Sequence, residues 1–435
     1  MKIRQLNKLW TGFGSFTLAA AAVASSDAPT ATSAFQPTVE PMQLAQGGEG
    51  GEAGESPSSY TLLSTDPQAY AFNVRPQVHN YAALVYDSYR QATAEAKKMQ
   101  AAVEAFLQQP TAATLAQARQ QWVAARPSYL VTEVFRFYDG PIDVAADGSP
   151  GPESRINAWP LNEAFIDYVK GQPASGLIGD VEVELTRASI VSRDQVSDEA
   201  DVTTGWHAIE FLLWGQDFND AGPGERPHTD YLPGDPVRER RRLYLQTVTA
   251  MLVDDLAALE ADWAPDADNY RRRFLALEPR EALGRAVNGM ANLVGHELAT
   301  ERLAVALDSG DQEDEHSCFS DTTHQDHLFD LRGARNIWFG SRGEQPAADG
   351  LGALVRKLDP AMAERTDALL TQALAAVALM DRPFERVLRA EPGSEPRQRA
   401  EAAITALQQL GAQFGAVGRR LGVLVIVPGL DSAAG

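Results

Sequence analysis

The stretch TLAQARQQWVAARPSYLVTEVFRF, residues 114–137, decides the fold class. Leu115, Ala118 and Trp122 recur in it every three or four residues, which is the spacing of side chains on one face of an α-helix. Pro127 interrupts the pattern, and because proline lacks a backbone N–H we expect it to kink or restart the helix. The stretch therefore predicts long helices rather than a sheet.

The same style continues on both sides, from about Val74 to the end of the chain. These segments are rich in Ala, Leu, Glu, Arg and Gln, which are good helix formers. Helices are expected over Tyr81–Leu107, Thr204–Gly215, Arg238–Ala261, Asn269–Asp308, Ala361–Leu388 and Arg397–Leu421. One strand-like run, Leu421–Val427, can simply end the last helix. The sequence predicts an all-α protein with two four-helix-bundle-like halves, 66–264 and 265–430, and leaves open whether they arose by duplication.

The first 65 residues are expected to lie outside the bundles. Three basic residues precede an uncharged apolar stretch, and Ala22-Val23-Ala24 fits the small-x-small cleavage pattern. This predicts a signal peptide over 1–24 and export to the periplasm or cell envelope of a bacterium. No cysteine stands at the cleavage site, so an N-terminal lipoprotein anchor is not expected. Residues 25–65 are rich in Ala, Gly, Ser, Pro and Glu, which predicts a disordered linker.

Charge and cysteine usage restrict the partners. The 59 acidic against 38 basic residues give a formal charge of −21, which argues against nucleic acid or an anionic membrane surface as partner and is compatible with cations. No membrane-spanning segment is expected in the mature chain. Cys318 is the only cysteine, so no intrachain disulfide forms. Cys318 is a buried small hydrophobe, a reactive thiol or a ligand.

The sequence GWHAIE, residues 205–210, places a histidine and a carboxylate on one helix face. His207 and Glu210 are three residues apart in an otherwise apolar helix, so their Cβ atoms lie roughly 5–6 Å apart. Such groups are costly to bury unless they are paired or bound to something. A metal ion is one such partner, and a plain His–Glu hydrogen bond is the alternative.

Two zinc-peptidase motifs begin in the chain and fail at their fifth residue. His296-Glu297 starts an H-E-x-x-H motif that ends in Thr300, and His207 starts an inverted motif that ends in Phe211. Neither supplies a second histidine on the same face. If H-x-x-E binds a metal here, further ligands must come from other helices.

Glu133 is the candidate for a third ligand. It lies among apolar neighbours near the end of a predicted helix, and carboxylates from separate helices assemble metal sites in helical bundles. Nitrogen and oxygen ligands of this kind suit iron or zinc. The alternative is a salt bridge from Glu133 to Arg136 on the next turn.

The loop EHSCFSDTTH, residues 315–324, combines several ligand types. It carries His316, Cys318 and His324, and six of the seven histidines of the chain fall between residues 207 and 327. The loop either closes a site or folds on itself through side-chain bonds to the backbone.

Six segments taken together resemble the imelysin-like family, which includes the iron-regulated protein A group and the insulin-cleaving membrane proteases. The segments are GWHAIEFLLWG (205–215), TEVFRFYDGPID (132–143), GPESRINAWPL (151–161), GHELATERL (295–303), EHSCFSDTTH (315–324) and GARNIWFG (333–340). The likeness spans most of the chain after residue 70.

The resemblance implies an all-helical, duplicated and exported protein that is linked to iron acquisition. It maps the shared G-x-H-x-x-E motif onto Gly205, His207 and Glu210 as the functional or metal site, near the junction of the halves. Arg136 and Asp143, in the matching segment 132–143, join the candidates. The expected ligand is an iron or zinc ion, or an iron-bearing small molecule such as haem, and an envelope receptor protein is an expected partner.

Three functions follow from these observations. The first is an iron-related binding protein of the cell envelope with its ligand at His207, Glu210 and Glu133. The second is a non-catalytic module that docks another protein, with the polar pair purely structural. The third is a metallopeptidase with Glu210 or Glu133 as general base, although the sequence contains no complete catalytic motif.

Overall fold

Long helices build the protein in the computed structural model, which describes residues 60–66, 69–219 and 222–430. The all-α prediction is confirmed. The expected signal peptide, 1–24, and most of the expected linker, 25–65, lie outside the described residues. Among the residues that are described, no helix has both the length and the apolar character needed to cross a membrane.

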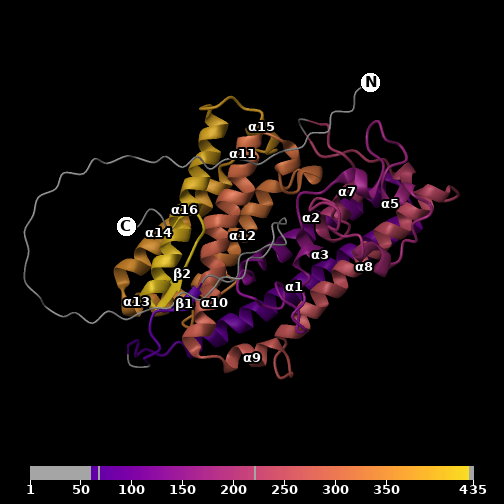
Figure 1. Ribbon diagram of the computed structural model, residues 1–435. Coiled ribbons are helices and arrows are strands. Elements are labelled where there is room, and N and C mark those ends of the chain that lie inside the picture. The colour runs from indigo at the N-terminus through magenta and orange to yellow at the C-terminus, as the bar shows by residue number, and fades with distance from the viewer. Residues whose placement is uncertain (1–59, 67–68, 220–221, 431–435) are drawn as a thin grey trace, which may run out of the picture. The chain divides into compact units, whose positions relative to one another are not determined.

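One group of helices surrounds α1 (Arg75–Gln108), the longest helix described. Helices α2 (Ala112–Leu130) and α8 (Pro236–Trp263) pack along α1, as Figure 1 shows. The short helix α7 (Gly205–Trp214) contacts both α2 and α8, and all ten of its residues are buried. An apolar helix buried on every side positions whatever polar groups it carries inside the protein.

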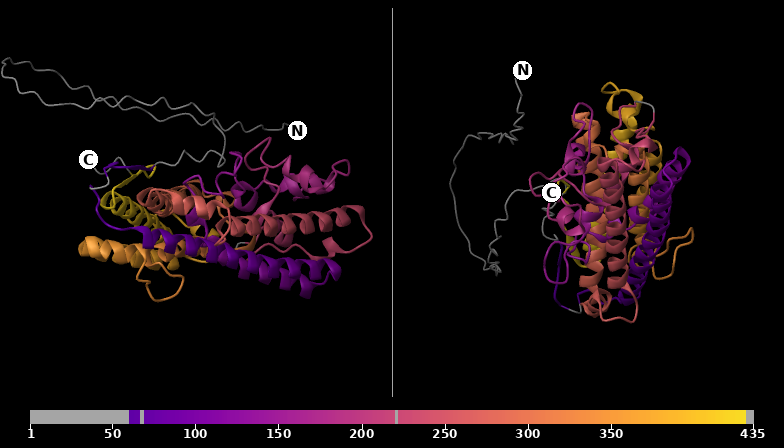
Figure 2. Two further views of the ribbon diagram at one scale, coloured as in Figure 1. Left: turned by 90° about the horizontal axis from the view of Figure 1, so that it is seen from below. Right: turned by 90° about the vertical axis from the view of Figure 1, so that its right-hand side faces the viewer.

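A second group surrounds α16 (Glu395–Arg420). It packs against α10 (Pro279–Asn292), the π-helix η3 (Leu293–Ala304) and α14 (Pro360–Ala378), and these helices run side by side in Figures 1 and 2. Helix α12 (Thr323–Phe339) joins the groups because it contacts α14 in one and α2 in the other. The boundary between residues 264 and 265 falls between α8 and the second group and stays a prediction.

Shorter elements connect these helices. They are η1 (Glu133–Phe135), α3 (Glu153–Asn157), α4 (Glu163–Ile166), α5 (Gly176–Gly179), α6 (Arg187–Val191), η2 (His228–Tyr231), α9 (Tyr270–Ala276), α11 (Val305–Ser309), η4 (Gln312–Asp314), η5 (Cys318–Ser320), α13 (Leu351–Leu358) and α15 (Glu385–Leu388).

The first and last described elements form a two-stranded antiparallel sheet. Strand β1 (Tyr60–Leu62) pairs with β2 (Val423–Val425). The strand-like run near the end of the chain is therefore a strand. The linker prediction was wrong at its end, because residues 60–62 are held by this pairing, and the hydroxyl of Tyr60 accepts a hydrogen bond from Arg285 at 3.1 Å.

Prolines explain where helix ends differ from the expectation. Pro127 lies inside α2, which continues three residues further to Leu130. Pro127 leaves the carbonyl of Val123 without its helical N–H donor, but the helix continues through it and does not restart there. The expected helix 361–388 instead ends at Ala378 and resumes as α15 after Pro383.

Candidate functional site

Gly205 sets the start of α7. Its φ of +85° lies in the left-handed region, and a Cβ atom here would come within 2.5 Å of the carbonyl oxygen of Ile156 in α3. Glycine alone tolerates both conditions. The backbone contact fixes α7 against α3, and His207 and Glu210 follow within the first two turns.

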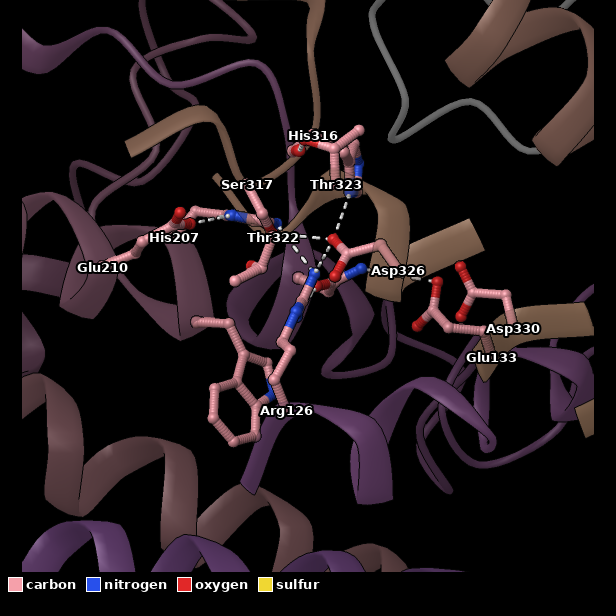
Figure 3. Close-up of polar contacts among 12 residues, drawn as sticks. Arg126, Glu133, His207, Glu210, His316, Ser317, Thr322, Thr323, Asp326 and Asp330 are labelled. Carbon is pink, nitrogen blue, oxygen red and sulfur yellow. Dashed lines mark hydrogen bonds and ion pairs between the residues drawn. The ribbon is translucent and has the colours of Figure 1, made fainter. Parts of the chain in front are cut away.

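His207 and Glu210 face one another with both side chains completely buried. His207 Nδ1 lies 2.9 Å from Glu210 Oε2, and Arg126 Nη2 lies 3.2 Å from His207 Nε2 (Figure 3). A guanidinium can only donate, so His207 Nε2 accepts from Arg126. The ring proton therefore resides on Nδ1 and is donated to Glu210.

Arg126 connects this pair to two further elements. From α2 it donates to Asn157 Oδ1 at 2.5 Å and to Asp326 Oδ2 of α12 at 3.0 Å. Asp326 Oδ2 also accepts from Ser317 Oγ at 2.7 Å and lies 3.5 Å from His316 Nδ1. Figure 3 shows His207 and Asp326 meeting the Arg126 guanidinium, and His316 meeting Asp326. We call His207, Glu210, Arg126, Asp326 and His316 the polar centre.

Aromatic rings enclose the polar centre. The Trp159 ring lies 4.7 Å from the His207 ring and 5.7 Å from those of His316 and Phe319, measured between centroids. The His207 and His316 rings meet edge to face at 5.0 Å. A hollow of about 890 Å³ beside α12 is lined by other residues. The polar centre is thus shielded from water.

Burial controls the protonation of the His207–Glu210 pair, called the dyad below. Burial, with the Arg126 charge second, lowers the pKa of His207 well below its usual value. Burial raises the pKa of Glu210 to about 8, although the backbone N–H and the hydroxyl of Ser320 both donate to Glu210 Oε1, at 2.9 and 2.7 Å. Near neutral pH the dyad is therefore mostly uncharged, and a bound cation would displace the Glu210 proton.

Asp326 carries a charge near neutral pH, whereas His316 does not. Burial works to raise the pKa of Asp326, but Arg126 and His316 outweigh it and hold the carboxyl ionised. Burial lowers the pKa of His316 to about 4, so this ring is neutral near pH 7. The Arg126–Asp326 ion pair is the charged part of the polar centre.

Glu133 is not brought together with His207 and Glu210 as one set of three ligands. It is buried on η1, where Glu133 Oε2 accepts from Arg302 at 2.7 Å and from Arg136 at 3.1 Å. These two cations outweigh burial and lower the pKa of Glu133 to about 2. The salt bridge to Arg136, the alternative in the sequence, is present.

Arg302 organises a second polar cluster from η3. Besides Glu133 it binds Glu297 Oε1 and Asp330 Oδ2, each at 3.0 Å. Asn157 links the two clusters, because its Nδ2 lies 3.4 Å from Glu133 Oε2 while its Oδ1 accepts from Arg126. Glu133 and Glu297 therefore reach the polar centre through intermediate residues.

The other candidates have separate surroundings. His296 is partly exposed and pairs with Glu301 at 3.5 Å. Asp143 Oδ2 accepts the backbone N–H groups of Tyr138 and Gly140 and so closes a turn. Cys318 is buried, and burial raises the pKa of its thiol well above the usual value. His324 is half-buried at the start of α12, and burial lowers its pKa to about 4.

Arg126, Asp326 and Ser320 escaped the sequence analysis. A signal existed for Arg126, which lies one turn after Trp122 on the apolar face of its helix and so must be buried. Ser320 lies in a polar loop segment and Asp326 in the first turn of α12, and neither carries a comparable signal because short polar residues at such places are usually solvated.

A histidine–carboxylate pair on one buried helix, tied by an Arg–Asp ion pair to helices of both groups, defines a helical-bundle protein with an enclosed polar centre. The family model described as imelysin (peptidase M75) matches residues 85–414, and the chain belongs to the imelysin family.

Relatives agree with this assignment. The iron-regulated protein A of Synechococcus elongatus is 24% identical over 357 residues, which cover 80% of this chain and 87% of that protein. A crystal structure of a candidate iron-regulated protein A precursor from Parabacteroides distasonis superposes with a TM-score of 0.63 at 18% identity, covering 80% of this chain and 95% of the other. An imelysin-like protein from Psychrobacter arcticum reaches a TM-score of 0.54 at 14% identity, covering 80% and 94%. The two structures support the fold.

Proposed function

We propose that this protein is an exported cell-envelope protein that binds iron, or a small molecule carrying iron, at His207 and Glu210 in iron acquisition. The observation that supports the proposal is the pair itself, because His207 Nδ1 and Glu210 Oε2 lie 2.9 Å apart with both side chains completely buried. Two ligand atoms at this separation can bind one ion. The relationship to an iron-regulated protein A supports the link to iron.

The donor atoms fit such a ligand. An imidazole nitrogen and a carboxylate oxygen suit iron or zinc. A metal between His207 Nδ1 and Glu210 Oε2 would take the place of the hydrogen bond between them. His207 Nε2 would keep its contact with Arg126, which Asn157 and Asp326 also hold at 2.5 and 3.0 Å.

The small number of protein ligands favours an iron-bearing compound over a bare ion. Within the described ranges, His207 and Glu210 do not gather with a third His, Cys, Asp or Glu at ligand distance. The remaining coordination positions would be filled by the compound's own atoms or by water. Since both side chains are fully buried, entry requires the loop 315–322 to separate from α7.

The test is a binding titration of the full chain after treatment with a chelator. Fe²⁺, Fe³⁺ as citrate, Zn²⁺ and haem are added separately, and binding is followed by calorimetry and by the absorption spectrum. We expect one equivalent of an iron species to bind, and His207→Gln and Glu210→Gln each to weaken it at least tenfold.

The matched control is His296→Gln, which alters another His–Glu pair that lies partly exposed on η3. It should bind like the original chain. Stoichiometric binding that survives loss of both His207 and Glu210 would refute the site. A lower melting temperature of His207→Gln with unchanged affinity would assign the pair a structural role instead.

A further inference from the structure

Three carboxylates from distant parts of the sequence meet beside the polar centre. Asp217 follows α7, Asp321 follows η5, and Glu385 opens α15. One oxygen atom of each lies within 4.8 Å of the corresponding atoms of the other two. We call Asp217, Asp321 and Glu385 the acidic trio. It shares no residue with the His207–Glu210 pair.

The acidic trio contains a buried oxygen atom that lacks a donor. Glu385 is 1% exposed; its Oε1 accepts from Gln312 Nε2 at 3.3 Å, while its Oε2 has no hydrogen-bond partner among the described residues. Asp321 Oδ1 is likewise without a donor, and the Asp321 and Glu385 carboxyls hydrogen-bond to each other when one of them is protonated. When both are ionised, these oxygen atoms need a group that the protein side chains do not supply.

The pKa values of the trio's aspartates also indicate that a neutralising group is needed. Burial, followed by the adjacent Glu385 carboxyl, raises the pKa of Asp321 to about 8, and burial raises that of Asp217 to about 6. Arg389 reduces the effect on Asp217, and its guanidinium donates to Gln312 Oε1 at 3.4 Å. Negative charge on Asp217 and Asp321 is nonetheless disfavoured, so either protons or a cation must neutralise it.

We propose that the acidic trio binds a hard divalent cation, with Ca²⁺ preferred. Its donors are all carboxylate oxygens, the ligands that Ca²⁺, Mg²⁺ and Mn²⁺ take in proteins. Three carboxylates in one site favour Ca²⁺, which accepts a larger and more flexible set of oxygen ligands, over Mg²⁺, which keeps several waters and is usually bound by one or two carboxylates.

The position of Asp321 gives this site a role. Asp321 directly follows Ser320, whose N–H and hydroxyl bind Glu210. A cation held by Asp321 would fasten the loop to α7 through Asp217 and to α15 through Glu385. The cation site would thus brace the segment that covers the polar centre.

The test uses the full chain after removal of metals with a chelator. Calorimetry should show one Ca²⁺ per chain, and Ca²⁺ should raise the melting temperature. Asp321→Asn and Glu385→Gln preserve side-chain size, and each should weaken Ca²⁺ binding at least tenfold. Glu391→Gln is the matched control, because Glu391 is an exposed carboxylate six residues after Glu385.

Several outcomes would overturn the proposal. These are no Ca²⁺ binding at millimolar concentration, equal binding by Asp321→Asn and the control, or tighter binding of Mg²⁺ than of Ca²⁺. If either variant does not fold, Asp217→Asn, at a partly exposed position, decides by the same criterion. His207→Gln should keep Ca²⁺ binding, so failure here and failure at the iron site can be told apart.

Discussion

A glycine is needed at position 205 for two reasons, its positive φ and its close contact with α3, and substitutions can distinguish them. Gly205→Ala must adopt a positive φ and push a Cβ against the Ile156 carbonyl oxygen at 2.5 Å. A left-handed backbone costs a side-chain-bearing residue about 1–3 kcal/mol, so with the clash we expect the free energy of unfolding to fall by about 3 kcal/mol or more. Urea unfolding measures the change.

Gly234 provides the control for this prediction. Its φ is +94°, but a Cβ atom there would meet nothing within 4 Å. Gly234→Ala should therefore lower the free energy of unfolding by about 1–2 kcal/mol, which is the cost of the backbone conformation alone. Equal losses in the two variants would show that the contact with α3 does not matter.

His327 makes stability depend on pH. Burial lowers its pKa from 6.5 to about 3, so the unfolded state binds one more proton than the folded state between these values. The free energy of unfolding then falls as the pH falls, by about 1.4 kcal/mol per pH unit from this residue. His327→Gln should remove that part of the slope between pH 6 and 5, measured by urea unfolding.

The exposed His79 supplies the comparison. His79→Gln should keep the original slope, because its ring faces solvent in the folded protein. Titrating groups other than His327 contribute equally to all three chains and cancel in the comparison. An unchanged slope in His327→Gln would contradict the prediction.

At this scale the sequence predicted contacts that helix geometry alone determines. His207 and Glu210 meet because residues three apart share a helix face. The Arg126–Asp326 ion pair joins residues 200 positions apart, and no local pattern encodes that distance. Glu133 was placed among ligands for the same reason, since its partner Arg302 comes from a remote helix.

Among the elements, η3 and α16 approach most closely at two glycines. A Cβ on Gly411 would lie 2.4 Å from the Cα of Gly295. Gly411→Ala should therefore force the helices apart and lower the free energy of unfolding by about 1–3 kcal/mol, as overpacking does. Denaturant unfolding measures the change.

Gly415, one turn later on α16, gives the opposite expectation. A Cβ there would meet a single flexible Arg419 atom at 3.9 Å. Gly415→Ala should stabilise the protein by about 0.5–1 kcal/mol, because alanine loses less backbone entropy in a helix. Two changes of the same sign would contradict close packing at Gly411.

Helix periodicity predicted the helical elements well and their interruptions less well. Prolines mark where a helix can end, but α2 runs through Pro127 and ends three residues later, which the proline alone did not predict. The π-helical winding of η3 was not predicted, because apolar periodicity does not distinguish it from an α-helix over so short a stretch.

For the whole molecule, the sheet of β1 and β2 ties the start of the described chain to its end. The Tyr60 ring would lie 3.0 Å from a Cβ on Gly284, and its hydroxyl binds Arg285. Tyr60→Ala should lower the free energy of unfolding by about 1–3 kcal/mol and speed hydrogen exchange in β2. Leu63→Ala, at an exposed side chain, should change neither. Unchanged exchange in Tyr60→Ala would show that this side chain does not hold the strand.

That pairing has a consequence for biosynthesis. β1 is made before all the described helices and β2 after them, so β1 has no partner until synthesis has passed Val425. The entropic cost of closing a loop grows only with the logarithm of its length, so the large separation of β1 and β2 in the chain does not prevent their pairing. A chain truncated before Val423 would present β1 as an unpaired strand edge, and faster digestion of that chain by protease would show that the pairing with β2 protects β1.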